Sequence, residues 1–165
     1  MKPTNSKPIH QKPFRAARGF TLLEIMTAIA IIGILAAISA PNVIAWQQTA
    51  KLRGAARDLM SDLSMARMQA IKTGDKVKVL FADSGYTLFI DANDDHAVDP
   101  GEKVLRRKDY PPGIVMQMTT FPAAKTAFHP SGAASPAGSV TLDRGSGTQI
   151  KIIVNLVGRI RVGSV

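Results

Sequence analysis

The sequence predicts an α+β protein in which one long N-terminal helix, with a transmembrane half and an amphipathic half, packs on a C-terminal antiparallel β-sheet head. Three features of the 165-residue chain predict this arrangement. A stretch without any charged residue runs from Ile25 to Ala50. An amphipathic helical repeat follows it, and short β-type runs with turn residues between them complete the chain. This length suffices for one domain with a core of its own, but not for two large ones.

Residues 1–19 form a basic segment that is interrupted by prolines. They carry five lysines and arginines and no acid, so they hold +5 of the net charge of +9. Pro3, Pro8 and Pro13 prevent a helix here. The segment is either a cytoplasmic tail or a leader that is removed, and we favour the leader. The rest of the chain, with 16 of the 21 basic residues against 12 acidic ones, is not a uniformly basic nucleic-acid-binding domain.

Residues 20–45 are apolar around the whole circumference of a helix, which requires either a bilayer or a deep protein core. A chain of this length offers no core that is deep enough, so we expect a single membrane span. The positive charge ahead of the segment predicts a cytoplasmic N-terminus and an exported head. Pro41 removes a backbone hydrogen bond and therefore predicts a kink in the helix.

Residues 46–72 are expected to continue as an amphipathic helix that enters the head. One apolar stripe recurs at spacings of four and three residues. It consists of Leu52, Ala56, Leu59, Leu63, Ala66 and Ala70. Thr73-Gly74-Asp75 ends the helix.

Residues 73–165 are expected to form the β-rich head. The strongest signal is a hairpin of 77–81 and 86–90, joined by Asp83-Ser84-Gly85. The segment 123–138 is rich in Ala, Ser, Pro and Gly and is expected to be a loop. Further strands are expected at 104–105, 114–118, 140–142, 149–156 and 159–162. The absence of cysteine excludes disulfides and thiolate metal sites.

The junction Gly19-Phe20-Thr21-Leu22-Leu23-Glu24, followed by the apolar run, resembles the N-terminal signature of type IV pilins and pseudopilins. In that family a prepilin peptidase cuts after the glycine and methylates the new N-terminus, which implies cleavage between Gly19 and Phe20 and N-methylation of Phe20. An ordinary secretory signal is cut after its apolar region. The best such site lies near Ser39-Ala40, where Pro41 would follow the cut and disfavour it.

Glu24 is the one carboxylate within the apolar helix. A carboxylate left alone at the centre of a bilayer costs about 2.5–3.5 kcal/mol, and less near a helix end. The side chain either reaches the lipid headgroups or, as the resemblance implies, meets the N-terminal amine of a neighbouring subunit during filament assembly. We favour the assembly role.

Two further segments are similar to the FimT/GspH family of minor pilins and minor pseudopilins, whose pilin fold joins one long helix to a β-rich head. Ala66-Arg67-Met68-Gln69-Ala70-Ile71 resembles the family's Ala-Arg-x-x-Ala-Ile segment. Gly158-Arg159-Ile160-Arg161 resembles a Gly-Arg-x-Arg motif of FimT-type members, which are linked to DNA binding in natural transformation. The resemblance implies a structural subunit of a type IV pilus or of a type II secretion pseudopilus.

The partners that this resemblance implies are a prepilin peptidase, other pilins or pseudopilins in a filament, the inner membrane and DNA. The chain would cross the bacterial inner membrane once, with its head in the periplasm, and would enter a pilus or pseudopilus on assembly. One alternative is an H-type minor pseudopilin with a purely structural role in secretion and no DNA binding. Another is a membrane-anchored β domain without a filament. No enzyme is expected, since no nucleophile elbow or phosphate loop occurs.

Arg159 and Arg161 are the candidate DNA-binding residues. On a strand they would share one face about 6.6 Å apart, with Ile160 and Val162 facing the core. Their guanidinium groups could bridge successive phosphates, and Lys151 or Arg144 would extend the patch in a suitable fold. The alternative is an ordinary solvated strand face. No aromatic side chain accompanies the motif, so base stacking is not expected. The basic run 106–108 is expected to be a solvated turn or edge.

The acidic segment 91–102 contains a weak calcium-binding pattern. The oxygen-bearing residues that match loop positions 1, 3, 5, 9 and 12 are Asp91, Asn93, Asp95, Asp99 and Glu102. His96 stands where that loop needs glycine, and Pro100 stands near the start of the expected exiting helix. We therefore favour an acidic connection with Asx turns and expect no cofactor and no metal, with calcium as the alternative.

Overall fold

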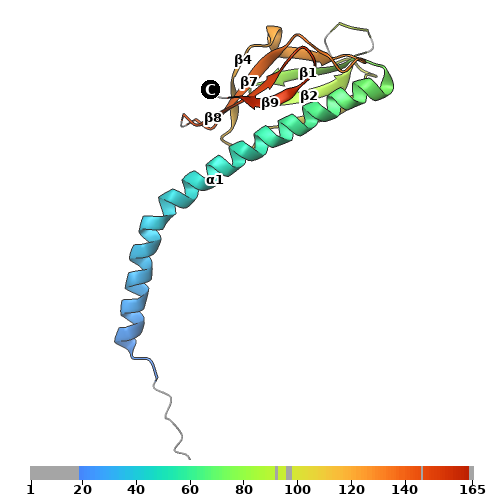
Figure 1. The fold of residues 1–165 in the computed structure, drawn as a ribbon. Coiled ribbons are helices and arrows are strands. Elements are labelled where there is room, and N and C mark those ends of the chain that lie inside the picture. The colour runs from blue at the N-terminus through green and yellow to red at the C-terminus, as the bar shows by residue number, and fades with distance from the viewer. Residues whose placement is uncertain (1–18, 92, 96–97, 146, 164–165) are drawn as a thin grey trace, which may run out of the picture. The chain divides into compact units, whose positions relative to one another are not determined.

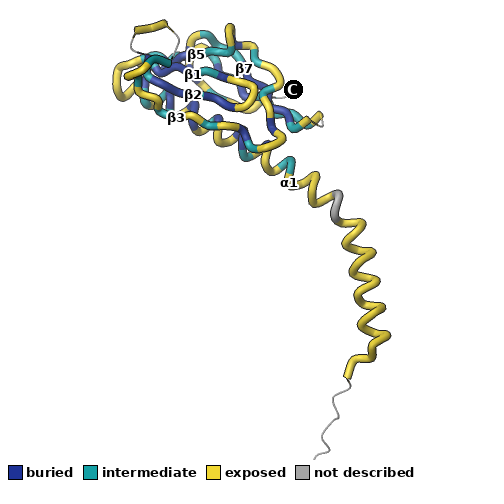
Figure 2. Tube along the Cα trace, turned by 180° about the vertical axis from the view of Figure 1, so that it is seen from behind, coloured by how far each residue is buried: buried dark blue, intermediate teal, exposed yellow. Residues whose placement is uncertain are grey.

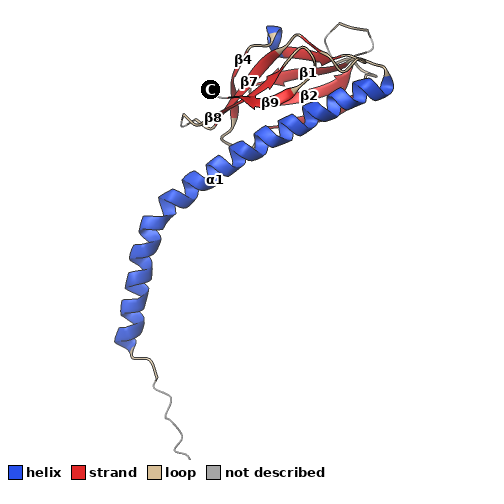
Figure 3. Cartoon of the chain, viewed as in Figure 1, coloured by secondary structure: helices blue, strands red, loops and turns tan. Residues whose placement is uncertain are grey.

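A computed structural model describes residues 19–91, 93–95, 98–145 and 147–163, without the side chains of residues 40 and 41. The chain divides into two compact units, Met1–Pro41 and Asn42–Val165. The helix α1, Leu22–Thr73, begins in the first unit and ends in the second. One long helix is followed by antiparallel sheets (Figure 3), which confirms the predicted fold class.

The described part of the first unit is a solvent-exposed apolar helix. The window Leu22–Ser39 is long and apolar enough to cross a membrane, and none of it is buried. Figure 2 shows this exposure as an unbroken run of exposed residues. Eighteen residues rise about 27 Å in a helix, close to the thickness of the hydrocarbon core of a bilayer.

The second unit begins with the amphipathic part of α1. Every residue of the predicted apolar stripe is at most 3% exposed, which confirms the helical periodicity. Side chains from both sheets join this stripe in one core, among them Val79 and Leu88 from one sheet and Leu142 and Ile152 from the other. All buried apolar side chains of the core lie between Leu52 and Val154.

The head contains a five-stranded sheet of order β3-β2-β1-β5-β6 and a four-stranded sheet of order β4-β7-β8-β9 (Figure 1). Every strand pair is antiparallel. The bounds are β1 Val77–Ala82, β2 Gly85–Ile90, β3 Val104–Asp109, β4 Val115–Thr119, β5 Lys125–Phe128, β6 Ala134–Ser135, β7 Gly138–Asp143, β8 Gln149–Val154 and β9 Ile160–Gly163, with a short 3-10 helix at Pro122–Ala124.

The hairpin of β1 and β2 confirms the strongest strand prediction. The prediction that 123–138 is a loop was wrong, because this segment contains β5 and β6. Strand β5 pairs with β1 from Val77↔Phe128 to Leu80↔Lys125. Phe128 is fully buried there. Long-range pairing and burial therefore overrode a local composition that is typical of loops.

Candidate functional site

The N-terminal junction lies at the start of α1. Gly19 and Phe20 precede the helix and are exposed. The Thr21 side-chain oxygen accepts a hydrogen bond from the Glu24 backbone N–H at 3.2 Å, so Thr21 caps the helix. Glu24 lies in the first turn, where the helix dipole favours a negative charge. An added Cβ at Gly19 would meet no atom within 4 Å. Packing in this structure therefore does not require a glycine at that position.

These positions fit the expected roles without testing them. Cleavage at Gly19–Phe20, methylation of Phe20 and the assembly role of Glu24 stay predictions. The predicted kink at Pro41 also stays a prediction, since Pro41 ends the first of the two separately described units.

Strand β9 carries the candidate DNA-binding arginines. Arg159 directly precedes the strand and Arg161 lies within it, and both are exposed. Arg161 pairs with Ile153 of β8, and Lys151 pairs with Gly163, so Lys151 lies on the same sheet face as Arg161. Of the two residues proposed to extend the patch, Lys151 therefore shares its face. Arg144 instead donates hydrogen bonds to the Ala45 carbonyl at 3.0 Å and the Thr49 hydroxyl at 3.1 Å.

Val162 lies on the core-facing side of β9, as predicted, since it pairs with the buried Ile152, but it is not buried itself. Its residue surface is 55% exposed, whereas Ile160 on the same strand packs against the core. The reason is that β9 is the edge strand of its sheet, so its distal end extends past the core.

The two family-like segments meet in the head. The Arg67 Nε donates to the Gly132 carbonyl at 2.8 Å, and Arg67 Nη2 donates to the Val157 carbonyl at 3.3 Å. Gly158 has a φ of 75°. A Cβ at this glycine would collide with the Gly132 carbonyl oxygen and lie 2.8 Å from Arg67 Nε. The glycine of the Gly-Arg-x-Arg motif therefore has a structural role. Sequence reasoning missed this contact, although an arginine between the two buried stripe residues Ala66 and Ala70 was a signal for it.

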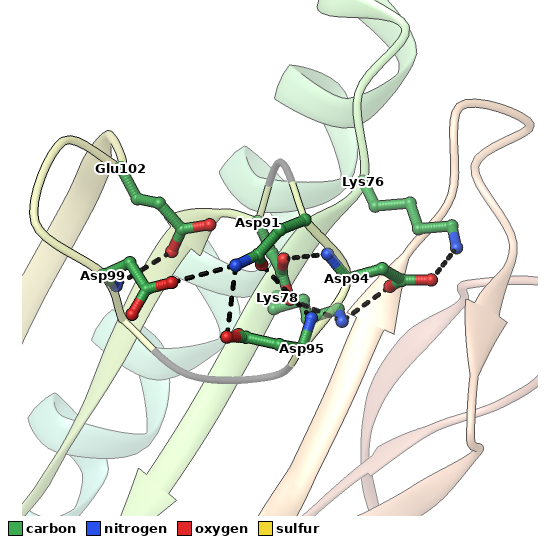
Figure 4. Close-up of polar contacts among 8 residues, drawn as sticks. Lys76, Lys78, Asp91, Asp94, Asp95, Asp99 and Glu102 are labelled. Atoms are coloured by element: carbon green, nitrogen blue, oxygen red, sulfur yellow. Dashed lines mark hydrogen bonds and ion pairs between the residues drawn. The ribbon is translucent and has the colours of Figure 1, made fainter.

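Two acids of the acidic segment, Asp91 and Asp94, pair with lysines that lie just before β1 or within it (Figure 4). Lys78 Nζ lies 2.6 Å from Asp91 Oδ2 and 2.7 Å from Asp94 Oδ1, and Lys76 Nζ lies 2.8 Å from Asp94 Oδ2. The side chains of Lys78 and Asp91 are almost fully buried. Burial alone would lower the pKa of Lys78, but the hydrogen bonds and charges of Asp91 and Asp94 outweigh it and raise that pKa. The hydrogen bonds from Lys76 and Lys78 lower the pKa of Asp94.

The remaining residues of the calcium pattern bond to one another. The Asn93 amide donates to Asp95 at 3.1 Å and to Asp99 at 2.9 Å, and Glu102 accepts from the Asp99 backbone N–H at 3.2 Å. In the described part of the chain, no group of three or more His, Asp or Glu side chains is arranged to hold a metal ion. The expectation of no metal, with calcium as the alternative, stays a prediction. His96, which stands in place of the glycine of this pattern, lies outside the described residues.

The basic run 106–108 lies on β3, the edge strand of the other sheet. Lys108 Nζ lies 2.8 Å from Asp58 Oδ2, and Arg106 Nη2 lies 3.4 Å from Asp62 Oδ1. Asp62 is buried and accepts a hydrogen bond from the Tyr86 hydroxyl at 2.7 Å. Burial, together with this bond to Asp62, raises the pKa of Tyr86. Two acids of α1 therefore neutralise two of the three basic residues of this edge.

Comparison with protein families gives two matches. Residues 55–158 match the family described as type II transport protein GspH. Residues 14–40 match the prokaryotic N-terminal methylation motif.

Two curated proteins match parts of the chain. The pilin-like protein PilA1 of Thermus thermophilus is 36% identical over 93 residues, which is 52% of this chain and 56% of that protein. The type IV major pilin protein PilA of Myxococcus xanthus is 62% identical over 34 residues, which is 21% of this chain and 16% of that protein. The chain thus spans little more than half the length of the first relative and far less of the second.

Two solved structures share the fold. The minor pilin FimU of Pseudomonas aeruginosa superimposes with a TM-score of 0.58 at 16% identity, covering 72% of this chain and 92% of FimU. The minor pseudopilin EpsH of Vibrio cholerae superimposes with a TM-score of 0.56 at 14% identity, covering 69% of this chain and 97% of EpsH. At such low identity, these likenesses concern the fold alone.

Proposed function

Because the chain belongs to the GspH family of type II transport proteins, and has the fold of minor pilins and minor pseudopilins, we propose that it is a minor subunit of a type IV pilus whose head also binds DNA. Its structural role as a pilin-type subunit follows from the family. The choice of the pilus and the binding of DNA are the new elements of this proposal.

The assembly role is supported by the exposure of the apolar helix. No residue of Leu22–Ser39 is buried by the described part of the chain, so this apolar surface must be covered by something else. The inner membrane covers it first, as a single span with the head in the periplasm. Neighbouring pilin helices cover it after cleavage at Gly19 by a prepilin peptidase. The Glu24 carboxylate then pairs with the methylated N-terminal amine of a neighbouring subunit, which removes the cost of an unpaired charge.

The assembly role has a direct test. We expect Glu24→Gln to leave processing at Phe20 and membrane insertion intact, while the variant is lost from sheared filaments. Mass spectrometry of the N-terminus and immunoblots of the membrane and filament fractions measure the three steps. Normal recovery of the variant in filaments would refute the role of Glu24.

The DNA-binding role rests on one observation, the exposure of Arg159 and Arg161 without an acidic partner. Within the described residues, neither guanidinium group forms an ion pair with a carboxylate. Lys151 adds a third positive charge on the same sheet face. Such a surface binds phosphates through charge, without sequence readout, and its affinity falls with salt.

The chain supplies a matched control for the DNA test. We expect Arg159→Gln/Arg161→Gln to weaken binding of a short DNA duplex and to reduce the salt slope by roughly 1 for each arginine. The control, Arg106→Gln/Lys108→Gln, removes the same charge from an edge where α1 already neutralises it, and should change binding much less. Equal losses in the two variants would mean that only net charge matters.

The second candidate function is a type II secretion pseudopilin without DNA binding. The match of residues 55–158 to the family described as type II transport protein GspH favours it. A deletion strain scored for transformation, twitching and exoprotein secretion separates the two, with complementation by the Arg159→Gln/Arg161→Gln variant. Loss of secretion alone supports the pseudopilin. Loss of transformation that this variant fails to restore supports the DNA-binding pilin.

A further inference from the structure

The outer edge of β9 is unpaired in the described part of the chain. This strand occupies the end of its sheet and pairs with β8 alone. An unpaired strand edge presents backbone N–H and C=O groups that can pair with a strand from another molecule. The strand is four residues long, enough for two residues to offer both groups outward.

The register identifies those two residues. The Asn155 backbone N–H donates to the Arg159 carbonyl at 3.1 Å, and the pairing continues through Ile153↔Arg161 and Lys151↔Gly163. Backbone groups of alternate residues point toward the neighbouring strand in an antiparallel pair. Those of Arg159 and Arg161 therefore point toward β8, whereas those of Ile160 and Val162 point away from it, toward the free edge.

A groove of about 270 Å³ lies beside this edge, between α1 and the strands β8 and β9. Its apolar lining consists of Ala56, Met60, Ile150 and Val162, and its polar lining is Arg53 and Arg57. None of the six lining residues is acidic. In the part of the chain that is described, no carboxylate forms an ion pair with either arginine.

We propose that the β9 edge and this groove dock an extended segment of a different protein, which adds a strand to β9 and places an aliphatic side chain and a carboxylate in the groove. Alternate residues of an added strand face the same side, so the two side chains belong at positions i and i+2. The aliphatic one contacts Met60 and Val162, and the carboxylate pairs with Arg53 or Arg57. This partner site is separate from the DNA-binding face and does not depend on it.

Charge argues against a second copy of this chain as the occupant. Its own β9, Ile160–Gly163, carries Arg161 and no acid, so a second copy would add positive charge and leave Arg53 and Arg57 without a carboxylate. Nucleic acid would satisfy the two arginines, but it would use neither the apolar lining nor the free backbone groups. An acidic, aliphatic protein segment uses all three features.

The head fragment Asn42–Val165 suits the test, since it forms a compact unit that contains the whole described core. The probe is the blocked peptide Thr-Leu-Thr-Glu-Thr, titrated to millimolar concentration into the ¹⁵N-labelled fragment. We expect the amide signals of Ile160 and Val162 to shift and saturate. A peptide with Lys in place of Glu should bind about tenfold more weakly, a difference that charge pairing of this kind can supply.

Two variant pairs make the result specific. Arg53→Glu/Arg57→Glu should exchange the preference, so that the Lys peptide becomes the tighter ligand. Val162→Pro removes an outward N–H and should abolish binding, whereas Val162→Thr keeps that N–H and should retain it. The dispersed spectrum of each variant reports its folding.

Three results would overturn the proposal. The first is the absence of any shift at Ile160 and Val162 at millimolar peptide. The second is equal binding of the Glu and Lys peptides. The third is a titration in which only a short DNA duplex, and neither peptide, perturbs Arg53 and Arg57, which would make the groove part of a nucleic-acid surface.

Discussion

The two strands that lie beside α1, β3 in one sheet and β9 in the other, are both edge strands with basic residues, but the helix neutralises only one of them. Toward β3 it presents Asp58 and Asp62, which pair with Lys108 and Arg106. Toward β9 it presents Arg53 and Arg57. The same kind of charge run is therefore a structural contact on one edge and an available surface on the other. The acids of the helix, and not the strands themselves, decide the difference.

The substitution with the largest expected effect on stability lies in the turn that precedes β9. Gly158→Ala forces a Cβ against the Gly132 carbonyl and strains a φ of 75°. We expect a loss of about 3–5 kcal/mol in the free energy of unfolding, from steric overlap and left-handed backbone strain together. Urea unfolding of the fragment Asn42–Val165 measures it.

Gly145 provides the control for that substitution. It has a similar φ of 80°, but a Cβ there would meet no atom within 4 Å. Gly145→Ala should cost only about 1–2 kcal/mol, because it pays for the backbone conformation alone. Equal losses in the two variants would contradict the close packing of Gly158 against Arg67 and Gly132.

The substitution with the next largest expected effect removes a contact between α1 and the β3 edge. Asp62→Ala leaves the buried Tyr86 hydroxyl and Arg106 without their acceptor. Leaving a buried donor unpaired costs about 1–3 kcal/mol. Adding Tyr86→Phe removes the orphaned hydroxyl, so the double variant should recover part of the loss. No recovery in a double-mutant cycle would mean that the hydrogen bond contributes little.

The pH dependence of stability at alkaline pH tests the same contact between Tyr86 and Asp62 without removing Asp62. The pKa of Tyr86 is raised by its burial and by Asp62. Above pH 10 an unfolded tyrosine loses its proton while the folded one keeps it, so the stability from this group is complete below about pH 10 and declines above it. We expect the wild type to lose about 1 kcal/mol more than Tyr86→Phe between pH 10 and 11. Identical pH profiles would exclude this linkage.

The smallest expected effect belongs to the exposed pair of the β3 edge. The side chains of Lys108 and Asp58 are 39% and 53% exposed. Asp58→Ala should therefore cost no more than about 0.5 kcal/mol in urea unfolding. The same variant should also strengthen DNA binding, although its effect on stability is small, since it frees Lys108. Unchanged DNA binding would show that the β3 edge lies outside any nucleic-acid surface.

Much of the fold was predictable because periodicity is a local property. The stripe from Leu52 to Ala70 has helical spacing, and the hairpin of β1 and β2 has strand residues around a Ser84-Gly85 turn. The departures from the predictions fell where neighbours distant in sequence decide the outcome. Strand β5 exists because β1 pairs with it, and Val162 is exposed because β9 has no outer neighbour.

The candidate sites divide in the same way. The junction Gly19–Glu24 could be recognised from the sequence alone, because its signature is a contiguous run of residues. The segment matched by the methylation motif includes it. The partners of the head's charged residues could not be recognised in this way. Lys78 and Asp91 are 13 positions apart, and Arg67 and Gly158 are 91 apart.

The sequence by itself determined that this chain carries an exposed apolar helix with a lone Glu24 and a β-rich head, since hydrophobic periodicity and local motifs suffice for that. Only the tertiary structure decided which charges remain available. Folding pairs Arg106 and Lys108 with acids of α1, and it places Arg53, Arg57 and Arg161 around an edge where no described acid pairs with them. The physical reason is that a charge's environment depends on the side chains that surround it in space, and strand pairing and helix packing choose those neighbours.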